Sequence, residues 1–404
     1  MDSLANAAAQ ALARGDPLGA LQRVALRHDA SALALRGIAM AQLGQLERAR
    51  ELLRRAARAF GPLEVVARAR CAVAEAEIAL AARDLAPARG LNTALRTLAR
   101  RGDTLNVWHG QLSIARRQLL LGRVADAAEV LDGIDWRGAP PRLVAMRELS
   151  RAEIALRGIE PRRARAALER AAEAAERAQI PALSREIEHA ARALVAPAAR
   201  LVNSGGVRLV TLEAVEQVLA SDALVVDACR RRVTGRGRTL SLARRPVLFA
   251  LASELARTWP LGAARDALIE HVFGARRPNA SHRARLRVEV SRLRAELRGL
   301  ADVAATAQGF TLLPHGGAAT LVLAPPIDGG EAALVALLSD GQPWSTSALA
   351  LALGESQRSV QRGLAALEEA GQVRAVGRGR ARRWVAPPLT GFTTTLLLPA
   401  LPVS

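Results

Sequence analysis

The densest group of chemically informative side chains lies in residues 281–294. Its arginines each carry a planar fork of N–H donors, which matches phosphate oxygens and the O6/N7 edge of guanine. A helix over this segment, begun by a serine cap, would also present backbone amides toward phosphate. The alternative is a solvated, charged helix face without a ligand. We expect nucleic acid to be contacted by Ser281, His282, Arg283, Arg285, Arg287, Arg292 and Arg294.

A second group of polar and basic side chains lies in residues 357–383. Two short helices separated by Gly354 have the spacing of a helix-turn-helix, in which the start of the second helix normally reaches base edges. This nominates Gln357, Arg358, Ser359, Gln361 and Arg362. Five further arginines fall within 374–383 without an acid among them and suit phosphate or minor-groove contact, namely Arg374, Arg378, Arg380, Arg382 and Arg383. The alternative is a domain recruited for protein contacts, and Trp384 is expected to be a packing residue.

Most catalytic chemistries lack their residues in this chain. There is no lysine and no tyrosine, so a Walker A loop, a Schiff base, a kinase-type ATP lysine and a tyrosine-nucleophile recombinase are excluded. The six histidines are scattered, and Cys71 and Cys229 lie far apart without a CxxC motif. We therefore expect no enzymatic activity, no metal site and no cofactor.

The charge of the chain is unevenly distributed. Its 404 residues hold 57 basic and 38 acidic side chains, for a net charge of +19. A GC-rich genome would explain arginine in place of lysine, but it does not by itself explain this surplus. The surplus is diffuse over residues 1–200 and concentrated in 201–325 and 374–383. Clustered charge is a stronger nucleic-acid signal than a high overall pI.

Composition also bounds the compartment and the number of domains. The length suggests two to four domains, and the 50% hydrophobic content allows sizeable cores. The N-terminal residues do not have the pattern of a signal peptide, and no uncharged apolar run is long enough to span a membrane. The two unclustered cysteines fit a reducing compartment. We expect a cytoplasmic protein without a membrane partner.

Residues 1–200 have the pattern of helical hairpins. Alanine, leucine, arginine and glutamate dominate, with apolar residues at three- and four-residue spacing. The segment Leu43–Ala49 recurs in outline as Ala82–Ala88 and Leu121–Ala127, each time with an offset of 39 residues. This pattern resembles tetratricopeptide-type repeats, although their usual period is about 34. The resemblance implies an α-solenoid whose concave face holds a peptide, a ligand, a protein partner or a second copy. A plain dimerisation or spacer arm is the alternative.

The pattern changes at Asn203–Gly206, which is expected to be a flexible break. Beyond it the sequence predicts a helix near 210–220, a β-type run at 223–229 and a short meander through 230–242. Three amphipathic helices are expected to follow, near 244–257, 263–273 and 281–298.

This stretch carries a specific resemblance. The string LVVDACRRRVTGRGRTLSLARRPVLFALASEL resembles the opening of the OmpR/PhoB-type winged-helix DNA-binding domain. Arg265–Gly274 is similar to that family's positioning helix, and Arg285–Leu297 to its recognition helix. The resemblance implies that the third helix lies in the DNA major groove and that the following hairpin touches the minor groove. The hairpin segment Thr306–Thr311 departs from the family because it is short and lacks the usual arginine.

A linker rich in proline and glycine, Ala324–Gly330, precedes a second domain over 326–390. An apolar helix is expected at 331–339, and Ser345 and Ser356 are expected to cap two further helices. Two short strands should flank Gly377–Arg380. The pattern resembles the winged helices of MarR- and GntR-like bacterial regulators. Beyond it, a tail over 391–404 contains a threonine- and leucine-rich run that suggests an extra strand.

Together these features predict a mainly α protein. An α-solenoid of helical hairpins over 1–200 would be followed by two winged-helix (α+β) domains over 205–316 and 326–390. The first hypothesis is a bacterial, nucleoid-associated transcriptional regulator that binds double-stranded DNA sequence-specifically. Because no phosphoacceptor receiver domain is recognisable, this regulator would be controlled through its repeats. The second is a DNA-binding adaptor that recruits a repair or defence machinery through the repeats.

Overall fold

The computed structural model describes residues 3–82, 84–88, 90–275, 277–326, 330–339, 342–377 and 379–386. It is mainly helical, with 62% helix and 18 α-helices over the described chain, and contains some sheet. Its contacts divide the chain into two compact units. Unit 1 holds the residues up to Ala155 together with Arg163–Arg192, and unit 2 holds Leu156–Arg162 and the described residues from Ala193 onward. Within the described ranges, every helix is too short or too polar to cross a lipid bilayer.

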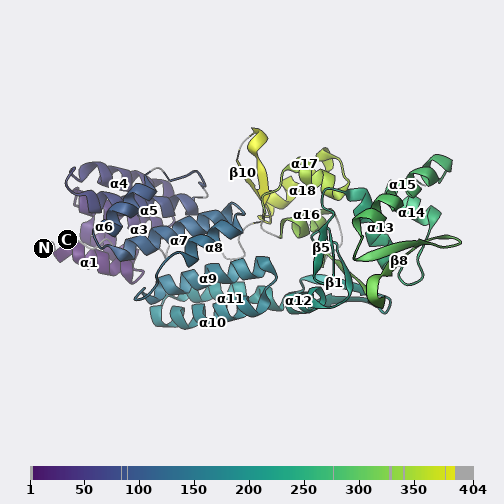
Figure 1. The fold of residues 1–404 in the computed structure, drawn as a ribbon. Coiled ribbons are helices and arrows are strands. Elements are labelled where there is room, and N and C mark those ends of the chain that lie inside the picture. Colours follow the sequence, from purple (N-terminus) through teal and green to yellow (C-terminus); the bar gives the residue numbers. More distant parts are fainter. Residues whose placement is uncertain are drawn as a thin grey trace. The chain divides into compact units, whose positions relative to one another are not determined.

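Residues 3–195 fold as a succession of helices joined by short turns (Figure 1). The helices are α1 (Ser3–Ala13), α2 (Pro17–Val24), α3 (Ala30–Gln42), α4 (Leu46–Ala59), α5 (Val65–Ala81), α6 (Leu91–Arg100), α7 (Thr104–Leu120), α8 (Val124–Asp132), α9 (Pro141–Gly158), α10 (Pro161–Ala178) and α11 (Pro181–Val195).

Sequence neighbours pack against one another in unit 1, as in the pairs α3–α4, α5–α6 and α7–α8. Small residues allow this close approach. A Cβ added at Gly37 of α3 would lie 2.9 Å from Cγ of Leu53 on α4, so glycine is needed where the two helices meet. Ala34, Ala41 and Ala49 are fully buried around this contact. The alanine-rich composition is thus used for helix packing.

The three segments found at an offset of 39 residues do not all fold alike. Gly44 and Gly122 both adopt left-handed backbone, with φ of 79° and 74°, and the next helix begins two residues later in each case. In the segment Ala82–Ala88, however, α5 has just ended and α6 does not begin until Leu91. The described residues Asp84–Ala88 of this segment therefore lie outside any helix.

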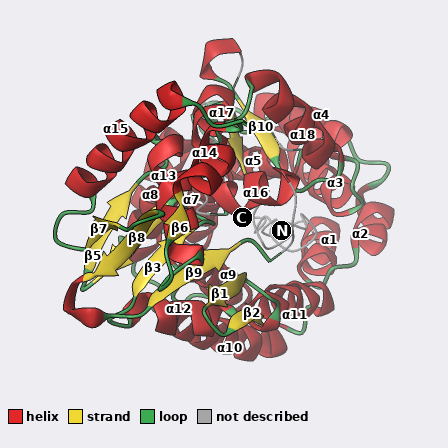
Figure 2. Ribbon diagram, turned by 90° about the vertical axis from the view of Figure 1, so that its right-hand side faces the viewer, coloured by secondary structure: helices red, strands yellow, loops and turns green. Residues whose placement is uncertain are grey.

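Unit 2 contains a six-stranded sheet in the order β2-β1-β9-β3-β4-β5, whose strands are among the yellow elements of Figure 2. The predicted flexible break at Asn203–Gly206 is wrong, because these residues form the turn between β1 and β2, with Asn203 paired to Gly206. β9 pairs with β1 on one side and runs parallel to β3 on the other. The strands are β1 (Ala199–Asn203), β2 (Gly206–Val210), β3 (Leu224–Asp227), β4 (Arg232–Gly235), β5 (Arg238–Ser241) and β9 (Thr320–Ala324).

Helices cover this sheet. α12 (Leu212–Ala220) packs by Val215 in a cluster with β1, β2 and β3. A larger core is formed by residues of β3, β4 and β9 with three helices, α13 (Pro246–Arg257), α14 (Arg265–Phe273) and α15 (Ala280–Glu296). These three helices lie within three residues of the predicted spans. A small sheet of β6 (Ala263–Ala264), β8 (Gly309–Pro314) and β7 (Ala301–Ala305) closes the other end of that core.

The last part of unit 2 has its own core. It comprises α16 (Gly330–Leu338), α17 (Thr346–Leu353), α18 (Gln357–Glu369) and the hairpin of β10 (Arg374–Val376) and β11 (Arg383–Val385). Trp384 is 4% exposed, and its Nε1 donates a hydrogen bond to Thr346 Oγ1 at 3.0 Å. Trp384 is therefore a packing residue, as predicted. The strand predicted in the tail lies outside the described residues.

Candidate nucleic-acid interface

The first basic helix is α15, and Asn279 begins it. The Asn279 side chain accepts a hydrogen bond from the His282 amide at 2.9 Å, and its extended backbone is the conformation that an N-cap requires. The prediction that Ser281 caps this helix is therefore wrong. Ser281 lies exposed within the first turn, because the helix starts one residue before it.

The two faces of α15 differ in their exposure to solvent. Leu286, Val290 and Leu293 are buried against the helices and sheet of unit 2. The opposite face exposes a row of small or apolar side chains at helical spacing, and its central Val288 is 51% exposed. Arginines lie on both sides of this row. The row consists of Ser281, Ala284, Val288, Ser291 and Ala295. Of these the sequence nominated only Ser281, because the other nominations on this helix were made for charged side chains.

Two of the nominated arginines of α15 are paired with acids. Arg283 Nη2 lies 3.3 Å from Asp266 Oδ1 on α14, and Arg292 Nη1 lies 2.9 Å from Glu289 Oε1 one turn away on α15. Both arginines remain more than half exposed. Asp266 is exposed as well, and an exposed ion pair is worth about 0–1 kcal/mol, so phosphate could replace this carboxylate at small cost. Glu289, by contrast, is only 13% exposed.

Arg285, Arg287 and Arg294 are held by other contacts. The Arg285 guanidinium lies 4.4 Å from the centroid of the Phe273 ring, and Arg287 Nε donates to the Arg283 carbonyl at 3.4 Å. Arg294 Nε donates to the carbonyl of Val303 at 2.6 Å. That bond joins α15 to β7, so Arg294 has a structural role in fixing the hairpin.

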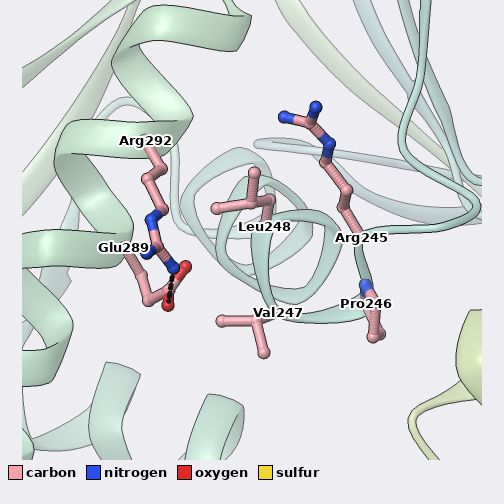
Figure 3. Close-up of a pocket in the computed structure, with 6 residues that line it drawn as sticks. All are labelled: Arg245, Pro246, Val247, Leu248, Glu289 and Arg292. Atoms are coloured by element: carbon pink, nitrogen blue, oxygen red, sulfur yellow. Dashed lines mark hydrogen bonds and ion pairs between the residues drawn. The ribbon is translucent and has the colours of Figure 1, made fainter.

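A pocket of about 400 Å³ separates the start of α13 from α15 (Figure 3). Arg245, Pro246, Val247 and Leu248 line one side, and the paired Glu289 and Arg292 line the other. Arg245 is also ion-paired, with Glu296. The pocket thus has two guanidinium groups at its walls, each of which is partly neutralised by a neighbouring carboxylate.

The β7–β8 hairpin is held by Arg265. Its Nη1 donates to the carbonyl of Ala307 at 2.8 Å and its Nη2 to that of Thr306 at 3.1 Å. The guanidinium also lies 5.6 Å from the centroid of the Phe310 ring. The turn between these strands carries no arginine of its own, as the sequence indicates.

The second basic helix is α18. Ser356 caps it, accepting from the Ser359 amide at 3.1 Å, and this confirms the predicted cap. Ser359 Oγ donates to Glu355 Oε2 at 2.9 Å, so this side chain is occupied at the start of the helix. Val360, Leu364 and Leu367 face the core. The exposed side chains of α18 include Gln357, Arg358, Gln361 and Arg362, none of which has a side-chain hydrogen bond or ion pair within the described chain. The acids Glu368 and Glu369 near the end of the helix are exposed as well.

The β10–β11 hairpin positions some of the remaining arginines. Arg382 Nη2 lies 3.5 Å from Glu368 Oε2, and its guanidinium lies 4.5 Å from the centroid of the Trp384 ring. Arg383 Nη1 donates to the Arg382 carbonyl at 2.9 Å, and Arg374 is half-buried on β10. Arg378 and the side chain of Arg380 lie outside the described part of the chain.

Within unit 2, Arg231 lies where the α13–α15 region meets the α16–α18 region. The sequence alone did not single out this residue. Arg231 adopts left-handed backbone with φ of 48°, and its guanidinium lies 4.9 Å from the centroid of the Phe249 ring on α13. Burial lowers the pKa of Arg231 to about 10, although attraction by Glu355 of the α17–α18 turn opposes the shift. A Cβ at the neighbouring Gly354 would lie 3.7 Å from Pro246 Cβ, so this turn packs against the start of α13.

In comparisons with known proteins, no protein-family model, no curated protein and no solved structure matches the chain.

Proposed function

We propose that this protein is a transcriptional regulator that binds double-stranded DNA sequence-specifically. In this proposal the α13–α15 region and the α16–α18 region each act as a winged helix, with α15 and α18 entering successive major grooves. Residues 1–200 act as an α-solenoid that senses a partner or ligand or mediates self-association. The proposal requires no enzymatic step and no cofactor.

One observation carries the proposal. Two helices of unit 2, α15 and α18, each begin at a capping side chain, bury one apolar face and expose arginines elsewhere, together with small side chains on α15 and glutamines on α18. Each is followed by a two-stranded hairpin, β7–β8 or β10–β11. A helix of this kind can place arginine and glutamine against base edges while its flanking groups bind phosphate.

The exposed row on α15 is compatible with close approach to base pairs. Ala284, Ser291 and Ala295 are short, and Val288 offers methyl groups suited to the C5-methyl of thymine. The arginines beside the row are then directed to the two phosphate backbones rather than to the groove floor. On α18, by contrast, Gln357 and Gln361 can donate to and accept from adenine, and Arg358 and Arg362 can bind guanine.

Selection of DNA sequences from a random pool by the full chain, followed by gel-shift titration, tests the proposal. We expect enrichment of a discrete motif and an affinity that falls steeply with salt, since each neutralised phosphate releases about 0.9 counterions. Absence of binding, or an affinity insensitive to salt, would reject it. Mapping of genomic occupancy together with expression after deletion then separates regulation from the adaptor hypothesis. Occupied promoters with altered transcription support a regulator, whereas diffuse or lesion-linked occupancy supports an adaptor.

A further inference from the structure

A cavity of about 200 Å³ lies within unit 1, between α5, α6, α7 and the described residues Asp84–Ala88 that lie between α5 and α6. These residues belong to the second of the three related segments, which departs from the other two. Its volume is below the range of about 300–1,000 Å³ that is usual for drug-sized ligands, so it suits a small metabolite. The cavity combines an apolar wall with a few polar side chains, which is the usual composition of a small-molecule site.

The charged side chains at this cavity, among its described lining residues, are Asp84 and Arg117. Arg117 donates from Nε and Nη2 to the carbonyl of Leu85 at 3.0 and 2.8 Å. Its Nη1 has no hydrogen-bond partner within the described chain. Burial lowers the pKa of Arg117, and repulsion by Arg123 adds to the effect. A negatively charged ligand group beside this guanidinium would offset both its burial and its repulsion by Arg123.

Asp84 supplies the opposite charge. Its Oδ2 accepts from Arg50 Nη2 at 3.0 Å, and its Oδ1 accepts from the Ala86 amide at 3.2 Å. Each carboxylate oxygen can accept a further hydrogen bond. Ser113 also lines the cavity, and it is 4% exposed. Because its hydroxyl donates to the His109 carbonyl at 3.1 Å, its lone pairs are available as acceptors.

Two further polar side chains, Asn92 and Gln118, line the cavity. Its aliphatic wall includes Leu80 on α5, Leu91 on α6 and Ile114 on α7. We propose that this cavity binds a small zwitterion with an apolar side chain, that is, an aliphatic α-amino acid. The ligand carboxylate binds Arg117, its ammonium group binds Asp84 and Ser113, and its side chain contacts the aliphatic wall. Binding does not depend on the DNA-binding proposal, so it is measured without DNA. A failure here would leave that proposal untouched.

Isothermal titration of the full chain with L-leucine, L-valine and L-isoleucine tests the assignment. Two half-ligands dissect it, because 4-methylpentanoate lacks the ammonium group of leucine and isopentylamine lacks its carboxylate. We expect at least one amino acid to bind and each half-ligand to bind about tenfold more weakly, since loss of one charge-assisted contact changes affinity by about that factor. Failure of all three amino acids to bind at millimolar concentration would overturn the proposal, as would equal affinity for 4-methylpentanoate.

Variants separate the site from the fold. Arg117→Gln would also release Leu85 and can therefore unfold the loop, so the decisive variant is Asp84→Asn, which keeps the shape and removes the charge. It should weaken amino-acid binding about tenfold and leave 4-methylpentanoate binding unchanged. Asp132→Asn is the matched control, because Asp132 pairs with Arg151 at 2.6 Å and does not line the cavity. If both variants bind leucine like the unchanged protein, Asp84 is not the ammonium site and the assignment is wrong.

Discussion

The two basic helices of unit 2, α15 and α18, differ in whether their arginines already have partners within the protein. On α15, Arg283 and Arg292 are paired with acids, and Arg294 bonds to a backbone carbonyl. On α18, Arg358 and Arg362 are exposed without a side-chain partner within the described residues. The arginine-rich α15 therefore presents a surface that the protein itself partly neutralises, whereas the two arginines of α18 are not neutralised in this way.

The number of arginines on a helix therefore does not by itself measure how strongly that helix can bind nucleic acid. An arginine that is already paired must exchange its carboxylate for a phosphate, so it contributes only the difference between the two contacts. An unpaired arginine contributes the full contact but loses more side-chain entropy when it binds. We therefore expect α18 to contribute more affinity per arginine, and α15 to contribute more to orientation.

The largest expected effect comes from Arg358→Ala combined with Arg362→Ala. Each good bidentate base contact is worth about 1–3 kcal/mol, so DNA binding should weaken by about thirtyfold or more in gel-shift titration. Arg283→Ala with Arg292→Ala on α15 should cost less, because both side chains already have acidic partners. The exposed pair Arg100→Ala and Arg101→Ala in unit 1 controls for net charge. Equal losses of DNA affinity in the α15 and α18 double variants would show that the acidic partners of Arg283 and Arg292 make no difference.

A smaller effect, on stability, distinguishes Arg294 from its neighbour. The sequence alone nominates both Arg292 and Arg294 as nucleic-acid contacts. The structure separates the two, because only Arg294 bonds to the Val303 carbonyl, at 2.6 Å. Hydrogen bonds to charged groups are worth about 1.5–3 kcal/mol, so Arg294→Ala should lower the free energy of unfolding by about 1.5 kcal/mol in urea titration. Arg292→Ala should leave it nearly unchanged, and equal destabilisation by the two would refute the structural role of Arg294.

The caps provide the next test. Asn279→Ala should destabilise α15, and Ser356→Ala should destabilise α18, each by about 1 kcal/mol, because a helix-end amide loses its acceptor. Ser281→Ala is the matched control on α15 and should change the free energy of unfolding by only a few tenths of a kcal/mol. Chemical denaturation followed by circular dichroism measures all three. A loss at Ser281 comparable with that at Asn279 would show that the helix begins later.

The smallest expected effect comes from removing an acid. Glu289→Gln frees Arg292 from its ion pair, so DNA affinity should rise about threefold at low salt and its salt dependence should steepen. Glu369→Gln is the control, because it removes one exposed acid from α18 without freeing an arginine in the described chain. Should both variants raise affinity equally, net charge rather than the release of Arg292 would be responsible.

Local signals explain which parts of the fold could be predicted. Helical periodicity placed α13, α14 and α15, and the serines at 345 and 356 with Gly354 placed α17 and α18, because caps and left-handed turns act on neighbouring residues. Pairing across long separations could not be predicted. β1 pairs with β9 more than a hundred residues later, and this pairing joins the local β1–β2 hairpin to the six-stranded sheet. Nothing local to Asn203–Gly206 shows that partner strand.

The sequence alone was enough to predict a basic helix at α15 and a capped helix at α18, since the charge pattern, the apolar period and the Ser356 cap are local to these helices. Only the tertiary structure decided which arginines are available. An arginine side chain is long enough to reach a carboxylate on another helix, as Arg283 reaches Asp266, or a carbonyl on a strand, as Arg294 reaches Val303. Those partners come together only when the core brings α14, α15 and β7 into contact.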